Sequence, residues 1–246
     1  MPVRAVLFDL DDTLLHHTRT SRQALSRVFT YQLEQQETTL ERLCFLNDSI
    51  YYELFPRFLN GELTREQARA IRFWRMLKDC GQDATTEKSE QEQSEHLALA
   101  YEKAYNLERI CIPGAVNLLR HLKNRVEVGI LTNNPVQSVQ DEMLLEVPLE
   151  HWFVSGAVGL KKPDPKFFLY ALEAVGCSPE DAVMVGDSWE KDVLPARALG
   201  MRAVWFNPYL LEAPLLDIQV LHEFEPLENA LNVILGLEHG PNEIKA

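Results

Sequence analysis

A short apolar run that ends in carboxylates constrains this chain more than any other feature of its sequence. Val3 to Phe8 is rich in β-forming side chains and is typical of a buried strand. Asp9, Asp11 and Asp12 follow at once, and three acids within four positions repel one another and resist desolvation. Such a cluster suits either a polar turn that caps a helix or a site for a divalent cation, because Mg²⁺ prefers carboxylate oxygens.

The pattern changes after this strand. From about residue 16 to residue 110 strand signals are nearly absent, and apolar side chains recur at helical spacing. One helix is predicted after Thr64, because the segment from Thr64 to Gln67 resembles a capping box. Ile71, Trp74 and Leu77 are expected to mark the buried side of that helix.

Beyond Pro113 the chain alternates between strands and amphipathic helices, which is typical of a parallel sheet covered on both faces. We therefore predict a doubly wound, Rossmann-like α/β core made of residues 1–15 and 111–246, with residues 16–110 inserted as an all-α cap. The insert begins at the carboxyl end of the first strand, where open parallel sheets bind ligands, so we expect it to cover an active site. The later strands are predicted over residues 126–131, 154–158, 182–185 and 203–206.

Charge and cysteine content argue against several classes of protein. The 246 residues include 37 acidic and 24 basic side chains, for a net charge of −13, so the chain lacks the basic surface typical of proteins that bind nucleic acid or anionic membranes. No apolar run approaches the ~20 residues of a membrane span. Cys44, Cys80, Cys111 and Cys177 lie far apart, which indicates reduced thiols in a cytoplasmic protein rather than a disulfide framework.

A second group of polar residues is predicted at the same edge of the sheet as the first acids. Asp187 and Asp192 follow one strand, Thr132 and Asn133 follow another, and Lys162 precedes a helix. The carboxyl ends of parallel strands share one edge, so these side chains are expected to meet there. Together with a metal ion they are the groups that bind and transfer a phosphoryl group. The chain has no G-x-x-x-x-G-K-[ST] or G-x-G-x-x-G sequence, which argues against a P-loop or a dinucleotide site.

Four short motifs occur in a fixed order along the chain. They are Asp9-Leu10-Asp11-Asp12-Thr13, Leu131-Thr132-Asn133, Lys162 followed by Pro163-Asp164-Pro165, and Gly186-Asp187-Ser188 with Asp192. Together they resemble the haloacid dehalogenase superfamily, in its phosphatase branch with a helical cap after the first strand. The resemblance covers essentially the whole chain. It implies a Mg²⁺-dependent phosphatase that hydrolyses a small phosphate ester, such as a sugar phosphate or nucleoside monophosphate, through an aspartyl-phosphate.

The resemblance also implies roles for individual residues. Asp9 is expected to be the nucleophile, and Asp11 the general acid that protonates the leaving alcohol and then activates water. Thr132 and the backbone amide of Asn133 are expected to hold the phosphoryl oxygens, while Lys162 neutralises their charge.

The metal site is implied in the same way. Mg²⁺ is expected on the Asp9 carboxylate, the Asp11 backbone carbonyl and the Asp187 carboxylate. Asp192 is expected either to bind the ion through water or to orient Lys162, and the sequence leaves both roles open.

Two positions depart from the family pattern or leave its assignment open. Asp12 stands where the family often has glycine, and since aspartate tolerates a left-handed backbone, we expect the turn to persist with one more charge. Lys161 lies beside Lys162, and we assign the role to Lys162 because it directly precedes Pro163.

Other functions are compatible with parts of this pattern. A phosphomutase shares the acids, and Thr13 favours a hydrolase over it by resemblance only. A catalytically silent interaction module and a receiver-like phospho-acceptor domain are the alternatives outside this enzyme class. The complete acid set with its lysine argues against the first, and the helical insert of about a hundred residues argues against the second.

A basic stripe lies within the predicted cap. Arg65, Arg69 and Arg72 fall at i, i+4 and i+7 of the helix that follows Thr64. Such a stripe suits a solvated helix face, and a sharper hypothesis is that it attracts an anionic substrate. The particular substrate and the oligomeric state are left open by the sequence.

Overall fold

The computed structural model describes residues 2–81, 87–134, 141, 144–214 and 217–237. The chain divides into two compact units. The core unit comprises Met1–His16 and Cys111–Ala246, and the helical unit comprises His17–Ile110. Each unit buries an apolar core of its own.

The core unit is built on a six-stranded parallel sheet with the strand order β3-β2-β1-β4-β5-β6. β1 is central, and all four of its residues are buried, as expected for a strand covered on both faces. The predicted doubly wound α/β fold is confirmed. The strands are β1 (Ala5–Phe8), β2 (Glu127–Thr132), β3 (His151–Val154), β4 (Ala182–Gly186), β5 (Arg202–Phe206) and β6 (Gln219–Leu221).

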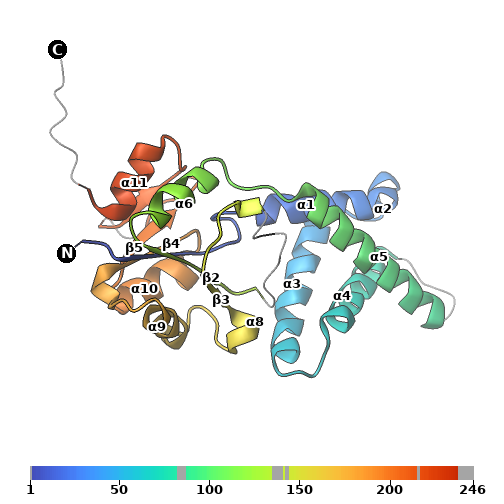
Figure 1. The fold of residues 1–246 in the computed structure, drawn as a ribbon. Helices are drawn as coiled ribbons and strands as arrows, with labels where there is room; N and C mark the ends of the chain where they lie inside the picture. The colour runs from blue at the N-terminus through green and yellow to red at the C-terminus, as the bar shows by residue number, and fades with distance from the viewer. Residues whose placement is uncertain (1, 82–86, 135–140, 142–143, 215–216, 238–246) are drawn as a thin grey trace, which may run out of the picture. The chain divides into compact units, whose positions relative to one another are not determined.

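Helices cover both faces of this sheet (Figure 1). Val6 and Phe8 of β1 pack with α6 (Ala115–Lys123) and α11 (Leu227–Leu235) on one face. Ala5 and Leu7 pack with α9 (Pro165–Ala174) and α10 (Leu194–Ala198) on the other. This alternation fixes the register of β1, because a slip of one residue would exchange the two sets of side chains. Shorter helical segments are α8 (Ser155–Val158), a 3₁₀ turn (Pro179–Asp181) and a π-helical turn (Trp189–Val193).

The strand predicted over residues 154–158 is wrong except at its first residue. β3 ends at Val154, and Ser155–Val158 form the short helix α8. The reason is the length of the neighbouring strand: β2 ends at Thr132, which pairs with Val154, so no further residue has a strand partner there. The amide of Gly156 instead donates to the carbonyl of Asn134 at 3.2 Å.

The helical unit consists of five helices in the described part of the chain. The predicted capping box is confirmed, because the Thr64 side chain accepts from the Gln67 amide and the Gln67 side chain accepts from the Thr64 amide. The predicted buried side of that helix is partly wrong: Leu77 is buried, but Trp74 is 37% exposed, and Phe73 and Met76 are buried instead. The helices are α1 (His17–Val28), α2 (Thr30–Glu34), α3 (Leu40–Leu59), α4 (Arg65–Asp79) and α5 (Glu87–Glu108).

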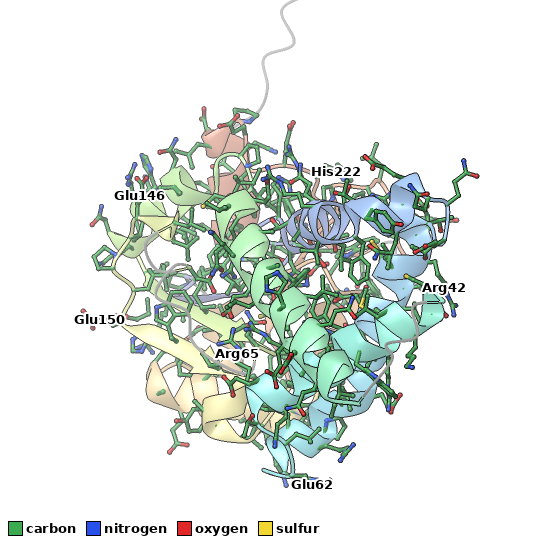
Figure 2. The ribbon with its side chains drawn as sticks, turned by 90° about the vertical axis from the view of Figure 1, so that its right-hand side faces the viewer. Arg42, Glu62, Arg65, Glu146, Glu150 and His222 are labelled. Carbon is green, nitrogen blue, oxygen red and sulfur yellow. The ribbon has the colours of Figure 1, made fainter. Side chains whose placement is uncertain are left out.

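Most arginines of the helical unit are paired with acids. Arg42 binds Asp79 with two hydrogen bonds of 3.0 and 2.5 Å, and it projects from the surface of the unit (Figure 2). Two members of the basic stripe, Arg65 and Arg69, share Glu102 at 3.8 and 2.6 Å. One carboxylate therefore offsets part of the charge of these two arginines.

The third member of the stripe has different surroundings. The guanidinium of Arg72 lies 5.4–5.9 Å from the ring centroids of Tyr51, Phe73 and Tyr101. Burial lowers the pKa of Arg72 from its ordinary value. The three arginines therefore do not form one uniform cationic surface, and the hypothesis that the stripe attracts an anionic substrate loses support.

No helix in the described ranges combines the length and apolarity needed to cross a bilayer.

Candidate active site

The turn after β1 places the first acids at the carboxyl edge of the sheet. Asp9 is 8% exposed, and its amide donates to the carbonyl of Val185 in β4 at 2.9 Å. The chain then turns sharply, with the Asp12 amide donating to the carbonyl of Leu15 at 2.7 Å. Asp12 has a φ of 59°, so the expected left-handed turn at this position is confirmed.

Three carboxylates from two strand ends gather at this edge. One oxygen each of Asp9, Asp187 and Asp192 lies within 4.8 Å of the others, although Asp9 and Asp187 are far apart in sequence. Asp11 is partly buried and lies two residues after Asp9 in the same turn, and its carboxylate is not part of this three-carboxylate cluster. We call Asp9, Asp187 and Asp192 the carboxylate cluster.

Lys162 is buried between two members of the carboxylate cluster. Its Nζ donates to Asp9 Oδ1 at 2.7 Å and to Asp192 Oδ1 at 2.6 Å, and only 3% of the residue is exposed. Lys161 is exposed, so the structure brings Lys162 rather than its neighbour to the acids. The other oxygen of Asp192 accepts from the Ser188 amide at 3.0 Å. Both oxygens of Asp192 are thus engaged, which favours the role of orienting Lys162.

Thr132 and Asn133 lie where β2 ends. Thr132 is 2% exposed, and its hydroxyl oxygen accepts from the amide of Asn134 at 3.1 Å, so the hydroxyl hydrogen is available for donation. The Asn133 side chain is bonded to the backbone of Lys162, accepting at 2.8 Å and donating at 3.0 Å. Its side chain therefore holds the lysine loop.

Two residues that position Asp187 were missed from the sequence. The fully buried Thr13 hydroxyl accepts from the Asp187 amide at 3.0 Å and donates to Asp187 Oδ1 at 3.4 Å. The indole of Trp205 donates to the Asp187 carbonyl at 2.8 Å. Thr13 belongs to the first of the four motifs, but no local sequence pattern links it to Asp187, which is 174 positions away. Trp205 has the sequence character of an ordinary strand residue.

The sequence identifies the family to which this site belongs. Residues 3–200 match the haloacid dehalogenase-like hydrolases (HAD hydrolases). The chain belongs to this family.

Relatives of this HAD hydrolase carry names of phosphatases. The phosphoserine phosphatase of Thermus thermophilus is 32% identical over 228 residues, covering 83% of this chain and 89% of that protein. The pyrimidine 5'-nucleotidase YjjG of Escherichia coli is 30% identical over 235 residues, covering 90% of this chain and 96% of that protein. Together with the family match, they support a phosphoric monoester hydrolase.

A solved structure supports the same fold. The HAD hydrolase YfnB of Bacillus subtilis, in a structure bound to magnesium, aligns with a TM-score of 0.68 and 25% identity. The alignment covers 94% of this chain and 100% of that one.

The carboxylate cluster of the hydrolase carries more negative charge than Lys162 compensates. Burial, followed by the charges of Asp9, Asp192 and Asp12, raises the pKa of Asp187 to about 9. Burial likewise raises the pKa of Asp192 to about 6, although Lys162 opposes that shift. Burial would lower the pKa of Lys162, but the charges of Asp192 and Asp9 outweigh it and raise that pKa above its ordinary value. The charge of Asp12 contributes to the raised pKa of Asp187 after burial and the charges of Asp9 and Asp192.

The residues present fit a divalent cation. Carboxylate oxygens are the ligands that Mg²⁺ prefers, and those of the cluster converge from two rigid strand ends. Among the described residues, no ammonium or guanidinium forms an ion pair with Asp187, and burial together with the neighbouring carboxylates raises its pKa. A bound dication would reverse that shift.

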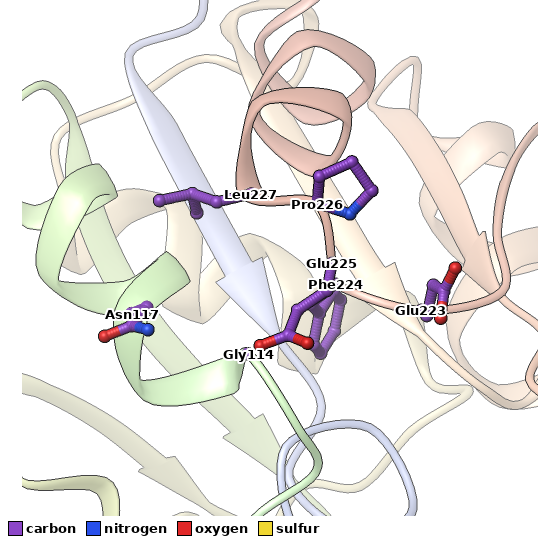
Figure 3. A pocket seen from close by; sticks show the side chains of 7 residues that line it. All are labelled: Gly114, Asn117, Glu223, Phe224, Glu225, Pro226 and Leu227. Carbon is purple, nitrogen blue, oxygen red and sulfur yellow. The ribbon is translucent and has the colours of Figure 1, made fainter.

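The core unit also has a cavity that is lined by residues other than those of the predicted site. It has a volume of about 560 Å³, and Glu225 lies beside Gly114 at the start of α6 (Figure 3). The residues that line it are Gly114, Asn117, Glu223, Phe224, Glu225, Pro226 and Leu227.

The raised pKa of Asp187 predicts a pH-dependent stability of the metal-free hydrolase. The pKa of Asp187 in the folded protein lies above its ordinary value of 3.8, so protonation of Asp187 stabilises the folded state. This stabilisation is complete below about pH 4 and is lost as the pH rises toward 9. The melting temperature of the wild type in EDTA, minus that of Asp187→Asn, is expected to fall over this range. Mg²⁺ at pH 8 is expected to raise the melting temperature of the wild type only. A difference that is constant with pH would contradict the assignment.

Gly186 leaves room for the Asp192 carboxylate. A Cβ at this position would lie 2.5 Å from Asp192 Cγ and Oδ2. Gly186→Ala is expected to displace that carboxylate from Lys162, lower the free energy of unfolding by about 1–3 kcal/mol and reduce kcat. Urea unfolding and turnover measure both effects. In the matched control Gly129→Ala, the Cβ crowds Leu7 at 3.0 Å instead, so stability should fall while kcat is kept. Equal kcat values for the two variants would refute this role of Gly186.

Proposed function

We propose that this hydrolase is a Mg²⁺-dependent phosphatase of a small phosphorylated metabolite, such as a sugar phosphate or a nucleoside monophosphate. The observation that carries the proposal is the meeting of Asp9, Lys162 and Asp187 at one sheet edge. A carboxylate beside a buried ammonium and a candidate metal site has what nucleophilic attack on phosphorus requires. The named activities of the relatives support the substrate class.

In this proposal Asp9 is the nucleophile. A carboxylate oxygen of Asp9 forms a bond to phosphorus, and the bond from phosphorus to the alcohol oxygen of the ester breaks. Asp11 transfers its proton to the leaving alkoxide. In the second step Asp11 removes a proton from water, the hydroxide attacks the same phosphorus, and the bond to Asp9 breaks to release phosphate.

The other residues hold the phosphoryl group in line. Thr132 donates its hydroxyl hydrogen to a phosphoryl oxygen, and the backbone amide of Asn133 donates to another. The ammonium of Lys162 offsets the negative charge of Asp9 and of the phosphoryl group as that charge shifts between them.

The metal would be held by the Asp9 carboxylate, the Asp11 backbone carbonyl and the Asp187 carboxylate. When bound, it supplies positive charge that brings two anions, the phosphate and the nucleophile, together. Thr13 and Trp205 keep Asp187 oriented toward this position. Cys44, Cys80, Cys111 and Cys177 are thiols rather than disulfides, which supports a cytoplasmic enzyme.

Asp9→Asn tests the nucleophile. The amide is nearly isosteric with the carboxylate but is a poor nucleophile, so kcat on a panel of sugar phosphates and nucleoside monophosphates should fall about 10³-fold or more, with the melting temperature nearly retained. Asp217→Asn is the matched control, because Asp217 lies in an exposed ion pair with Arg197 at 2.9 Å. Phosphate release by the wild type and the control, but not by Asp9→Asn, is the expected result. A substantial rate for Asp9→Asn would remove Asp9 from this role.

Metal removal tests the cofactor. EDTA is expected to stop phosphate release, and excess Mg²⁺ to restore it. Asp187→Ala should raise the Mg²⁺ concentration for half-maximal activity by at least about 10-fold, with a much smaller change in KM for the ester. Turnover that persists in EDTA would contradict the metal dependence, and an unchanged Mg²⁺ requirement in Asp187→Ala would contradict the ligand assignment.

A further inference from the structure

The backbone of Lys162 is held from another strand end. Asn133 Oδ1 accepts from the Lys162 amide at 2.8 Å, and Asn133 Nδ2 donates to the Lys162 carbonyl at 3.0 Å. An asparagine side chain has an acceptor and a donor side by side, so it satisfies both backbone groups of one residue. Aspartate would lack the donor, and alanine would lack both groups.

This contact matters because of what lies at the far end of the lysine. The Lys162 ammonium contacts Asp9 at 2.7 Å and Asp192 at 2.6 Å, and only 3% of the lysine is exposed. A lysine side chain has a flexible four-carbon stem, so contacts of the ammonium alone do not fix where the stem begins. The two bonds from Asn133 fix that origin, and the two carboxylates fix the end.

The position of Asn133 in the chain adds a second consequence. It directly follows Thr132, whose hydroxyl is assigned to the phosphoryl oxygens, and its own backbone amide has the same assignment. A side-chain substitution leaves that backbone amide in place. The side-chain contribution of Asn133 can therefore be separated from the backbone contribution by mutation.

We propose that the Asn133 side chain is a positioning residue that acts through Lys162, coupling the end of β2 to the ammonium beside Asp9. The inference rests on the proposed function, because it concerns how the phosphoryl site is kept in register. Misplacement of a charged group by about 1 Å can cost about 100-fold in rate. The contribution of Asn133 should therefore appear in phosphate binding and turnover, and it should vanish when Lys162 is absent.

A double-mutant cycle tests this dependence. The dissociation constant of inorganic phosphate in excess Mg²⁺, measured by calorimetry, and kcat on a responsive ester are compared for the wild type, Asn133→Ala, Lys162→Gln and the double variant. Asn133→Ala is expected to weaken phosphate binding about 10-fold or more in the wild type. In the Lys162→Gln background the same substitution should change it less than about twofold.

Asn207 provides the matched control. At the end of β5 its side chain makes the same pair of bonds with one backbone, donating to the Leu211 carbonyl at 2.9 Å and accepting from the Leu211 amide at 3.0 Å. Asn207→Ala should lower the melting temperature about as much as Asn133→Ala while phosphate affinity stays within about twofold of the wild type. Thermal denaturation of every variant verifies that each is folded.

The outcomes separate the inference from the proposed function. Equal losses from Asn133→Ala in both backgrounds, or no loss in either, would overturn the positioning role while wild-type turnover leaves the phosphatase proposal standing. Equal effects of Asn133→Ala and Asn207→Ala on phosphate affinity would reduce the contact to general stability and overturn it too. A wild type that neither binds phosphate nor hydrolyses any ester would overturn both.

Discussion

One buried ammonium holds together two carboxylates that would otherwise repel each other. Lys162 bridges Asp9 and Asp192 in surroundings where charges interact strongly and desolvation is expensive. Loss of one partner from such a group leaves a buried charge uncompensated, which typically costs about 3–5 kcal/mol. Among the described residues, Asp187 has no cationic partner, and the negative charges of the neighbouring Asp9 and Asp192 favour a cation at this edge. The same electrostatic arrangement therefore determines both the stability of the edge and its chemistry.

The parallel sheet makes this arrangement possible. β1 lies between β2 and β4, and Phe8 pairs with Ile130 on one side and Val185 on the other. The register of β1 and β4 holds because all their residues are buried, so a slip of one residue would exchange their two buried faces. Residues of the following turns are then carried by rigid elements, which is how loops gain the precision that catalysis needs. The two hydrogen bonds between the Asn133 side chain and the Lys162 backbone fix the position of Lys162 at that edge.

Elements whose signals are local were predictable. The capping box at Thr64, the left-handed turn at Asp12 and the alternating core units depend on neighbours in sequence, and they are present as expected. Two predictions failed for a common reason. Residues 154–158 have apolar character, but the end of β2 at Thr132 decides where pairing stops, and the packing of the helical unit leaves Trp74 partly exposed. In both cases distant partners outweighed the local pattern.

The sequence by itself determined the kinds of groups available and their order along the strand ends, which is why the family and the class of chemistry could be predicted. The tertiary structure decided which groups touch. It paired Lys162 rather than Lys161 with the acids, used both oxygens of Asp192, and recruited Thr13 to Asp187. The physical reason is that hydrogen bonds and ion pairs act over a few ångströms, and only the packed sheet brings residues more than 100 positions apart within that range.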